Sequence, residues 1–293
     1  MSVTIALAGN PNCGKTTMFN ALTGANQYVG NWPGVTVEKK EGKLKNQKDV
    51  TVTDLPGIYS LSPYTLEEVV SRDYLLKEKP DVIIDLVDAT NIERNLYLAT
   101  QLLEIGIPVV IALNMVDLLK KNNIHINVKG LSSALGCPIV ETSALKGTGL
   151  KEVVDEAIKC ANQHRVPSKQ MEFPKAVEKA VNEIEGFVPA NIAEENKRWY
   201  AVKLLERDSK VKEGLNLPAS AQSRIEEIAS GLEKAEDDDT ESIVTDGRYQ
   251  YIQKVVSANV KRSGNKMTVS DKIDRIVTNR FLGIPIFMLV MWI

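Results

Sequence analysis

The residues of this 293-residue chain that are best suited to chemistry lie close to its start, where residues 9–16 read GNPNCGKT. The run fits the pattern G-x-x-x-x-G-K-[ST], in which backbone N–H groups of a glycine-rich loop and of the following helix surround phosphate oxygens. Lys15 is predicted to reach the β- and γ-phosphates of a nucleotide, and the Thr16 hydroxyl to bind Mg²⁺. The residues predicted to form this phosphate site are Gly9, Asn10, Pro11, Asn12, Cys13, Gly14, Lys15, Thr16 and Thr17.

Two further residues that suit phosphate chemistry, Asp54 and Gly57, lie in the sequence DLPG. The Asp54 carboxylate can hold Mg²⁺, directly or through water, and the Gly57 N–H can meet the γ-phosphate. D-x-P-G is also ordinary turn chemistry, so the motif gains its meaning from the phosphate loop that precedes it.

A second group of polar residues follows two later apolar runs and is suited to recognising a base. Asp117 ends the sequence NMVD, and its carboxylate matches the ring N–H and exocyclic amine of guanine, which adenine does not offer together. Asn114 is predicted to tie this segment to the phosphate loop, and the Ala144 N–H to meet the guanine carbonyl. N-x-x-D alone also begins helices, but the motifs in this order predict GTP. The predicted base site comprises Asn114, Met115, Asp117, Ser143, Ala144 and Leu145.

The segment 26–36 contains two glycines and a proline and is predicted to be a mobile loop that acts as a first switch. Thr36, beside Gly34 and Val35, is placed to bind Mg²⁺ while the γ-phosphate is present and to release it after hydrolysis. Ile58 stands where many regulatory GTPases carry a glutamine that orients water, and no arginine lies in the phosphate loop or this switch. A metal ion is therefore expected to balance the charge that develops in phosphoryl transfer.

Strand-like and helix-like segments alternate over roughly the first 165 residues. This alternation predicts an α/β domain over residues 1–165 with a mostly parallel sheet and helices on both faces. With the motifs above, this domain resembles that of a small GTPase. Ligands of such sheets lie at the carboxyl ends of the strands, and the motifs fall there. Strands are predicted at residues 3–7, 35–44, 50–53, 82–87, 109–113 and 138–140. Helices are predicted at residues 66–77, 91–105, 127–135 and 150–160.

The second half of the chain is predicted to be an all-α domain over residues 171–262, because its apolar residues recur at helical spacing. An acidic run at 236–239 is predicted to be a solvated connection. The segment 263–293 is predicted to be an amphipathic linker and the start of a truncated transmembrane helix, since the apolar run 281–293 is too short to span a bilayer. Four helices are predicted, around residues 176–184, 199–205, 225–232 and 252–260.

The composition limits the class of partner and the compartment. The 36 basic and 38 acidic side chains leave no basic excess for binding nucleic acid. Cys13, Cys137 and Cys160 form no C-x-x-C pair, which argues against a disulfide framework or a structural zinc site and suits a reducing compartment. No secretory signal is expected, because the chain begins directly with a strand-like run.

Four segments extend these motifs: the phosphate loop at 9–16, VGNWPGVTVE at 29–38, DLPGIYSL at 54–61 and VDATNIERNLYL at 87–98. Together they resemble the GTPase domain of the bacterial ferrous iron transport protein B family. In that family GTP hydrolysis is activated by potassium, and water is positioned by the backbone of the first switch rather than by a glutamine. The helical region then corresponds to the domain that links the GTPase to the membrane and helps to hold GDP.

The resemblance also implies a set of ligands for metal ions. Carried over by motif position, the K⁺ ligands are the Asn12 side chain and the backbone carbonyls of Gly30 and Trp32, beside GTP phosphate oxygens. Asn12 could instead only cap the loop, and Trp32 could only pack against a neighbour. The implied cofactors are Mg²⁺, bound by Thr16, Thr36 and Asp54, and K⁺, with GTP and GDP as substrate and product. The residues implied in catalysis are Lys15, Asn12, Thr36 and Gly57.

The wider function follows only from the resemblance and the apolar tail. It implies potassium-activated GTP hydrolysis coupled to Fe²⁺ uptake across the bacterial inner membrane, with these residues facing the cytoplasm. Expected partners are a guanine nucleotide, the membrane through a further transmembrane domain, a small SH3-like accessory protein and other copies of the chain, but no nucleic acid. An alternative stays open: a soluble regulatory or RNA- and ribosome-associated GTPase, whose relatives also carry an asparagine at this loop position.

Overall fold

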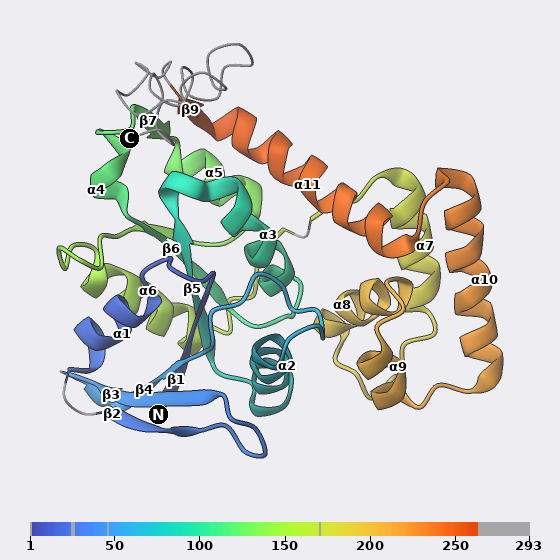
Figure 1. Cartoon of the computed structure of the whole chain (residues 1–293), viewed down its shortest axis with the longest axis horizontal. Coiled ribbons are helices and arrows are strands. Elements are labelled where there is room, and N and C mark those ends of the chain that lie inside the picture. The colour runs from blue at the N-terminus through green and yellow to red at the C-terminus, as the bar shows by residue number, and fades with distance from the viewer. Residues whose placement is uncertain (1, 25–26, 46, 170, 263–293) are drawn as a thin grey trace, which may run out of the picture.

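The computed structural model describes residues 2–24, 27–45, 47–169 and 171–262. Its centre is a seven-stranded sheet in the order β2-β3-β4-β1-β5-β6-β8 (Figure 1). β4, β1, β5, β6 and β8 run parallel, and β2 and β3 add an antiparallel edge, which confirms the predicted α/β class. The strands are β1 (Val3–Gly9), β2 (Gln27–Asn31), β3 (Glu38–Leu44), β4 (Gln47–Asp54), β5 (Val82–Asp88), β6 (Val109–Asn114) and β8 (Ile139–Glu141).

Successive residues of each strand point to opposite faces of the sheet, and apolar residues occur on both faces. Helices therefore cover both faces and bury these residues. Ile5 of β1 packs in a core cluster with α1 (Lys15–Thr23) and α6 (Leu150–Asn162), whereas the neighbouring Ala6 packs in the opposite cluster. That opposite layer contains α2 (Leu66–Asp73), the π-helical turn Tyr74–Glu78, η2 (Ala89–Asn91), α3 (Ile92–Leu103), α4 (Val116–Leu119) and α5 (Val128–Leu135).

The antiparallel edge of the sheet differs from the sequence prediction. The segment 26–36 is not wholly a loop, because β2 occupies much of it and pairs with β3. β3 begins at Glu38, later than predicted, since the Trp32 N–H donates to the Val37 carbonyl at 2.9 Å and closes a hairpin there. β2 is a polar edge strand, so it lacks the continuous apolar run that marks strands buried on both faces.

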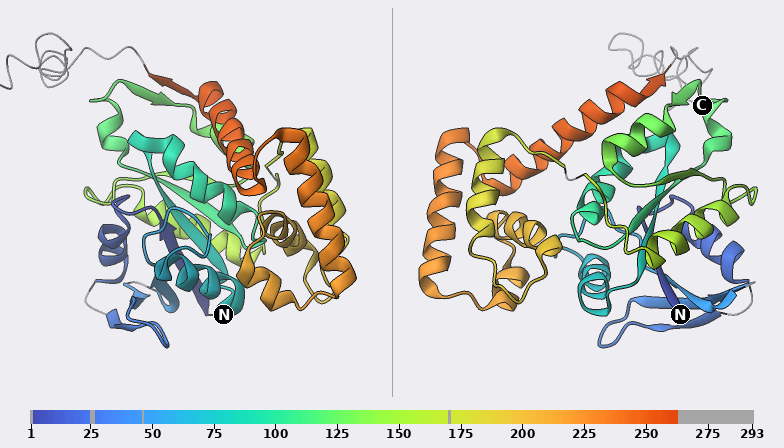
Figure 2. Two further views of the ribbon diagram at one scale, coloured as in Figure 1. Left: turned by 45° about the vertical axis from the view of Figure 1, so that its right-hand side comes forward. Right: turned by 180° about the vertical axis from the view of Figure 1, so that it is seen from behind.

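The C-terminal half folds as helices beside the sheet domain, and α11 leads back to it (Figure 2). Its described residues form five helices rather than four: the additional one, α9, is short and is capped at its start by Asp208, whose carboxylate accepts the Val211 N–H at 3.1 Å. The acidic run 236–239 connects α10 to α11 as predicted, and Asp239 caps α11. The helices are α7 (Lys175–Glu185), α8 (Glu194–Leu205), α9 (Ser209–Leu215), α10 (Ala219–Glu236) and α11 (Thr240–Asn259).

The end of the described chain is a strand, although the sequence predicts that the last helix includes Val260. β9 (Val260–Arg262) pairs antiparallel with β7 (Ile124–Ile126), a strand that the sequence analysis does not predict. Three residues on each side are too few to show a period in the sequence, so the pairing is set by tertiary contacts. It joins the end of the helical half to the sheet domain (Figure 1).

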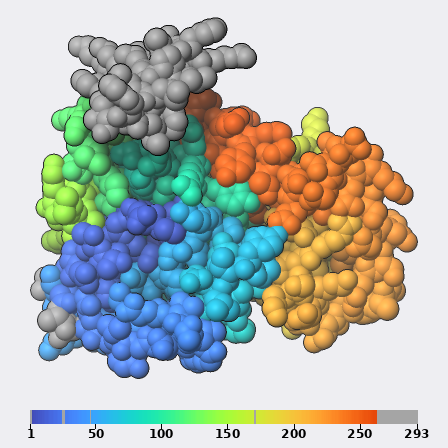
Figure 3. Space-filling view, viewed as in Figure 1, coloured from blue at the N-terminus to red at the C-terminus, as the bar shows by residue number. Residues whose placement is uncertain are grey.

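Two buried ion pairs fasten the helices to the sheet domain, whose surfaces adjoin in the space-filling view (Figure 3). Arg248 of α11 holds Glu104, at the end of α3, by two hydrogen bonds of 2.7 and 3.1 Å, and both side chains are 1% exposed. Arg72 of α2 lies 2.7 Å from Asp208, and both of these side chains are 3% exposed. Such pairs are costly to break, because the remaining charge stays buried without a partner.

The carboxyl group of Asp85 in β5 is buried in the apolar core without a basic partner among the described residues. It is 1% exposed, stands in register with Ala8 and Ile111 of the adjacent strands, and has one oxygen with no hydrogen-bond partner among the described residues. Burial raises its pKa from 3.8 to about 7, because the charged form loses its hydration. The folded state therefore binds a proton that the unfolded state releases at lower pH.

Replacement of Asp85 by asparagine is expected to remove a pH-dependent loss of stability. The wild-type carboxyl destabilises the fold progressively as pH rises from about 4 to about 7, by about 1.4 kcal/mol for each unit of pKa difference. The free energy of unfolding of Asp85→Asn, relative to the wild type, should thus rise by a few kcal/mol between pH 5 and pH 8. Urea unfolding at both pH values measures this change, and a difference that does not vary with pH would contradict it.

The predicted linker and transmembrane start, residues 263–293, lie outside the described residues. Within the described part of the chain, no helix has the combination of length and apolar character that a membrane span requires.

Candidate nucleotide site

A cavity of about 720 Å³ opens at the carboxyl ends of β1 and β6, where parallel sheets of this kind hold ligands. Its volume suits a small-molecule ligand. All of its lining residues except Leu118 are residues that the sequence predicts to bind nucleotide. They are Asn10, Pro11, Asn12, Gly14, Lys15, Thr16, Thr17, Gly57, Asn114, Met115, Asp117, Leu118, Ser143, Ala144 and Leu145.

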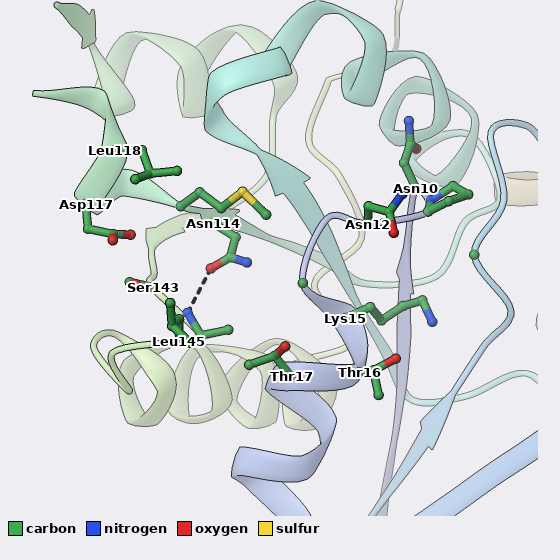
Figure 4. Close-up of a pocket in the computed structure, with 15 residues that line it drawn as sticks. Asn10, Asn12, Lys15, Thr16, Thr17, Asn114, Asp117, Leu118, Ser143 and Leu145 are labelled. Carbon is green, nitrogen blue, oxygen red and sulfur yellow. Dashed lines mark hydrogen bonds between the residues drawn. The ribbon is translucent and has the colours of Figure 1, made fainter. Parts of the chain in front are cut away.

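The cavity has two chemically different ends (Figure 4). Lys15 and Thr16, at the start of α1, supply a cation and a hydroxyl at one end. Asp117 and Leu118 lie at the other end, beyond Asn114. A ligand that uses both ends must carry an anionic group and, at a distance, a group that donates hydrogen bonds to a carboxylate.

The phosphate loop needs its two glycines for different reasons. Gly9 has φ 148°, and a Cβ atom there would come within 2.8 Å of the Leu86 carbonyl oxygen. Gly14 has φ 95°, and a Cβ atom would collide with the Asn114 amide. Between them Asn12 takes a left-handed conformation with φ 65°, which asparagine tolerates better than most residues. The loop can therefore approach both β5 and the base segment closely.

Lys15 is paired with Asp54. Its ammonium lies 2.7 Å from Asp54 Oδ1 and also donates to the Leu55 carbonyl, and both side chains are buried. The sequence predicts that Lys15 contacts phosphate and that Asp54 contacts Mg²⁺, so the pair holds together two groups with separate predicted roles. Asp54 does not line the cavity.

Asn114 joins the base segment to the phosphate loop, as the sequence predicts. Its amide donates to the Cys13 carbonyl at 2.8 Å, while its Oδ1 accepts the Ala144 N–H at 2.9 Å (Figure 4). This second bond engages the same Ala144 N–H that is predicted to meet a guanine carbonyl, so the base would have to share this donor with Asn114. Sequence could not show this, because Asn114 and Ala144 meet only when β6 and β8 pair.

Asp117 is held in its ionised form by its neighbours. The Ser143 hydroxyl, and with it Lys146 at 3.3 Å, keeps the pKa of Asp117 below its usual range. An ionised carboxylate only accepts hydrogen bonds, so this end of the cavity selects a ligand with adjacent N–H donors. Lys146 is a contributor that the sequence analysis does not identify, and no motif marks it.

The segment after β4 reaches the phosphate loop closely. A Cβ atom on Gly57 would lie 3.2 Å from the Pro11 Cα, and the Ile58 N–H donates to the Gly9 carbonyl at 3.3 Å. Ile58 itself is 2% exposed, so its side chain belongs to the core and not to the cavity. The position that carries glutamine in many regulatory GTPases is therefore filled by a buried apolar group.

The residues of the predicted first switch lie away from the cavity. Gly34 and Thr36 are exposed, and neither they nor Val35 line it. Gly30 belongs to β2, and the Trp32 carbonyl accepts the Val35 N–H at 3.3 Å. No group of three or more His, Cys, Asp or Glu side chains suited to a metal occurs in the described residues.

Trp32 has the packing role that its residue type suggested. Its side chain is buried, with its ring edge-on to that of Tyr74 at 5.3 Å between centroids and with Lys39 Nζ 5.1 Å from the ring centroid. This contact anchors the switch to the end of α2. With the ring already in contact with Tyr74 and Lys39, the backbone carbonyl is the oxygen of Trp32 that could act as a metal ligand.

Comparison with known proteins places these features in a family. The sequence profile of the family described as Ferrous iron transport protein B matches residues 3–157, and that described as FeoB cytosolic helical domain matches residues 173–261. The Fe(2+) transporter FeoB of Shigella flexneri is 40% identical to the chain over 304 residues, which cover 99% of this chain and 38% of that protein. The chain thus spans less than half the length of the curated relatives that it matches.

Solved structures from S. thermophilus resemble the described fold closely. A GDP-bound mutant of the FeoB G-domain has a TM-score of 0.85 and 47% identity, and the match covers 88% of this chain and 100% of that one. NFeoB bound to GDP, AlF₄⁻ and K⁺ has a TM-score of 0.80 and 48% identity over 87% of this chain and 99% of that one. The chain therefore belongs to the ferrous iron transport protein B family and contains both the G-domain and the cytosolic helical domain of that family.

Proposed function

We propose that this chain binds GTP with Mg²⁺ and hydrolyses it to GDP and phosphate with the assistance of K⁺. The observation that carries the proposal is the cavity that holds Lys15 at one end and ionised Asp117 at the other. Phosphate groups require the first end, and the adjacent N–H donors of guanine match the second. The GDP-bound state of the S. thermophilus relative supports the same assignment.

Binding of the triphosphate rearranges the Lys15–Asp54 pair. The ammonium exchanges the carboxylate for β- and γ-phosphate oxygens, and Asp54 becomes available to Mg²⁺ together with the hydroxyls of Thr16 and Thr36. Both charges stay paired throughout, which matters because both side chains are buried. Gly57 offers its N–H to the γ-phosphate from its position against Pro11.

The proposed K⁺ ligands have the right chemistry, since all are uncharged oxygen donors. Asn12 lines the cavity beside the phosphate end, and the carbonyls of Gly30 and Trp32 belong to the hairpin of the first switch. A bound K⁺ would supply positive charge close to the phosphates, which no arginine of the phosphate loop or first switch provides. The relative crystallised with GDP, AlF₄⁻ and K⁺ supports this choice.

The first switch must move for this assembly to form. Thr36 is exposed and outside the cavity, so the hairpin that carries it has to approach the γ-phosphate, with Gly34 and Val35 following it. With Ile58 buried, the attacking water is positioned by backbone groups of this switch. Lys15, Asn12, Thr36 and Gly57 then make the contacts that stabilise the transferring phosphoryl group.

For the whole protein we propose a role in bacterial Fe²⁺ uptake, as in the Fe(2+) transporters that it resembles. The described residues then face the cytoplasm beneath the inner membrane, and an SH3-like accessory protein and further copies of the chain are its proposed protein partners. Switch movement is proposed to reach the helical domain through α2, because Arg72 on that helix is paired with Asp208. Residues beyond those described supply the iron ligands.

GTP turnover in KCl and in NaCl tests the proposal. The wild type is expected to be at least about tenfold faster in KCl, and Asn12→Ala to lose that gain, since removal of one transition-state contact costs a factor of this order or more. Asn122→Ala, an exposed asparagine outside the cavity, is the matched control and should keep the full response to K⁺. Equal wild-type rates in the two salts would refute the K⁺ site but not GTP binding.

A further inference from the structure

β7 and β9 pair at one end of the molecule (Figure 1). The charged side chains exposed on these strands and beside them are mostly basic. The two stretches of sequence that build this surface, 118–140 and 247–262, contain no Asp or Glu. Its charged and ionisable side chains are all exposed. We call it the basic face, and it consists of Lys120, Lys121, His125, Lys129, Lys261 and Arg262.

The strand pairing turns the side chains of His125 and Lys261 outward together, whereas Arg262 stands opposite Ile124 and belongs to the other side of this small sheet. His125 stands directly opposite Lys261 in the β7–β9 register, and both are exposed, while the neighbouring Ile124 is 8% exposed. Residues directly opposite in an antiparallel pair lie on the same side of the sheet. Lys261 therefore faces another basic side chain and not a carboxylate across the pair, so its charge is available to an anion outside the sheet.

The remaining lysines are held beside this sheet by local backbone structure. Lys120 and Lys121 occupy the turn between α4 and β7, which closes with Asn123 at φ 51°. Lys129 lies in the first turn of α5, and the Asn127 N–H before it donates to the Asn259 carbonyl at 2.8 Å. The positions of the lysine backbones are therefore fixed relative to one another before any partner arrives.

Little negative charge in the described residues compensates the basic face. Arg262 lies 3.6 Å from Glu93, and both side chains are about half exposed. Among the described residues, no carboxylate lies within 4.0 Å of Lys120, Lys121, Lys129 or Lys261. An external polyanion is thus the partner that this surface fits.

We propose that the basic face docks on the anionic surface of a lipid bilayer. A group of exposed lysines is attracted to a dense layer of negative headgroups, and the attraction falls off within about one Debye length. The sequence after Arg262 reaches the apolar run 281–293, which suits a membrane and not a nucleic acid. The inference rests on the proposed function only in placing the chain beside a membrane.

Docking in this way would act next to the base end of the cavity. α4 begins directly after Met115 and contains Asp117, and Lys120 follows its last residue. The same short helix therefore connects the carboxylate proposed to read guanine with the lysines proposed to meet lipid. Contact with the bilayer would reduce the freedom of that segment.

Sedimentation with vesicles tests the proposal on the whole 293-residue chain. Binding to phosphatidylcholine vesicles measures the affinity that the apolar run 281–293 contributes. The additional binding to vesicles with 30% phosphatidylglycerol measures the affinity that charge contributes. The triple variant Lys120→Gln, Lys121→Gln, Lys261→Gln should bind the anionic vesicles at least tenfold more weakly than the wild type and bind the neutral ones equally well. The wild-type excess on anionic vesicles should disappear at high salt.

Two control variants make the result specific. The first control replaces Lys120, Lys121 and Lys261 by arginine, which keeps the charge and should retain binding. The second control is the triple variant Lys48→Gln, Lys151→Gln, Lys234→Gln. These lysines are exposed outside the basic face, so their replacement should have no effect. Equal weakening by both Gln triples, or no difference between the two kinds of vesicle, overturns the proposal. The proposal is also overturned if the chain binds double-stranded RNA more tightly than it binds the vesicles and if this RNA binding depends on Lys120, Lys121 and Lys261.

Binding of a fluorescent GDP analogue in the same samples separates this proposal from the proposed GTPase function. The basic face lies outside the cavity. The variant with Lys120→Gln, Lys121→Gln and Lys261→Gln should therefore bind the analogue in solution as tightly as the wild type does. If the wild type does not bind the analogue, the proposed nucleotide site is contradicted, while the vesicle result still tests the basic face.

Discussion

A chain with Asp117 replaced by asparagine is expected to bind GDP at least about 100-fold more weakly than the wild type. The carboxylate can accept two hydrogen bonds from guanine, and bonds to a charged partner contribute about 1.5–3 kcal/mol each. Asparagine keeps one acceptor but turns an N–H group toward the exocyclic amine, so a donor faces a donor. Calorimetric titration of GDP into both chains measures the loss as a ratio of dissociation constants.

The same substitution should improve the affinity for a xanthine nucleotide, which provides the matching test of geometry. Xanthine carries a carbonyl where guanine has its amine, and the asparagine amide can donate to it. Asp155→Asn, an exposed acid on α6 outside the cavity, is the control and should leave GDP binding unchanged. Undiminished GDP binding by Asp117→Asn would place the base elsewhere.

Replacement of Arg248 by alanine is expected to lower the free energy of unfolding by about 3–5 kcal/mol. Glu104 would then remain buried, at 1% exposure, without the two hydrogen bonds that compensate its charge. Loss of the guanidinium also removes its contact with the Phe173 ring, 5.2 Å away. Urea unfolding at pH 7 measures the change, and the midpoint should fall without loss of helix in the folded baseline.

A second substitution distinguishes the unpaired charge from a simple packing defect. Glu104→Gln combined with Arg248→Met removes both charges and should recover much of the stability that Arg248→Ala loses. Arg224→Ala breaks an ion pair whose side chains are 56% and 65% exposed, and it should cost less than about 1 kcal/mol. A double variant as unstable as Arg248→Ala alone would show that packing, not charge, dominates this contact.

The central sheet and the cavity could be predicted because their signals are local. Each buried strand is a short apolar run, and each polar motif follows such a run directly, so the motifs meet wherever parallel strands end together. The edge strand β2 and the strands β7 and β9 could not be predicted in this way. They are polar or very short, and they form only by pairing with another strand. α9 is missed for a related reason: it is short and defined mainly by its Asp208 cap.

Within the site, the residue types and the link from Asn114 to the phosphate loop were predictable, but most of the other bonds were not. The sequence gives no means to see that Lys15 pairs with Asp54, or that the Ala144 N–H is taken by Asn114. Both contacts depend on which buried polar atoms come within reach of each other after folding. The same holds for Lys146, which reaches Asp117 only because the β8–α6 segment turns back over the base end.

The pairing of β7 with β9 sets an order of events during synthesis. A growing chain exposes β7 well before β9 leaves the ribosome, and translation needs on the order of ten seconds to cover the intervening sequence. During that interval, the segment from Asn114 through α4 is held at the phosphate loop but has no partner strand at its far end. The strand β7, which follows the base segment in the sequence, thus gains its partner only after the whole helical half has been made.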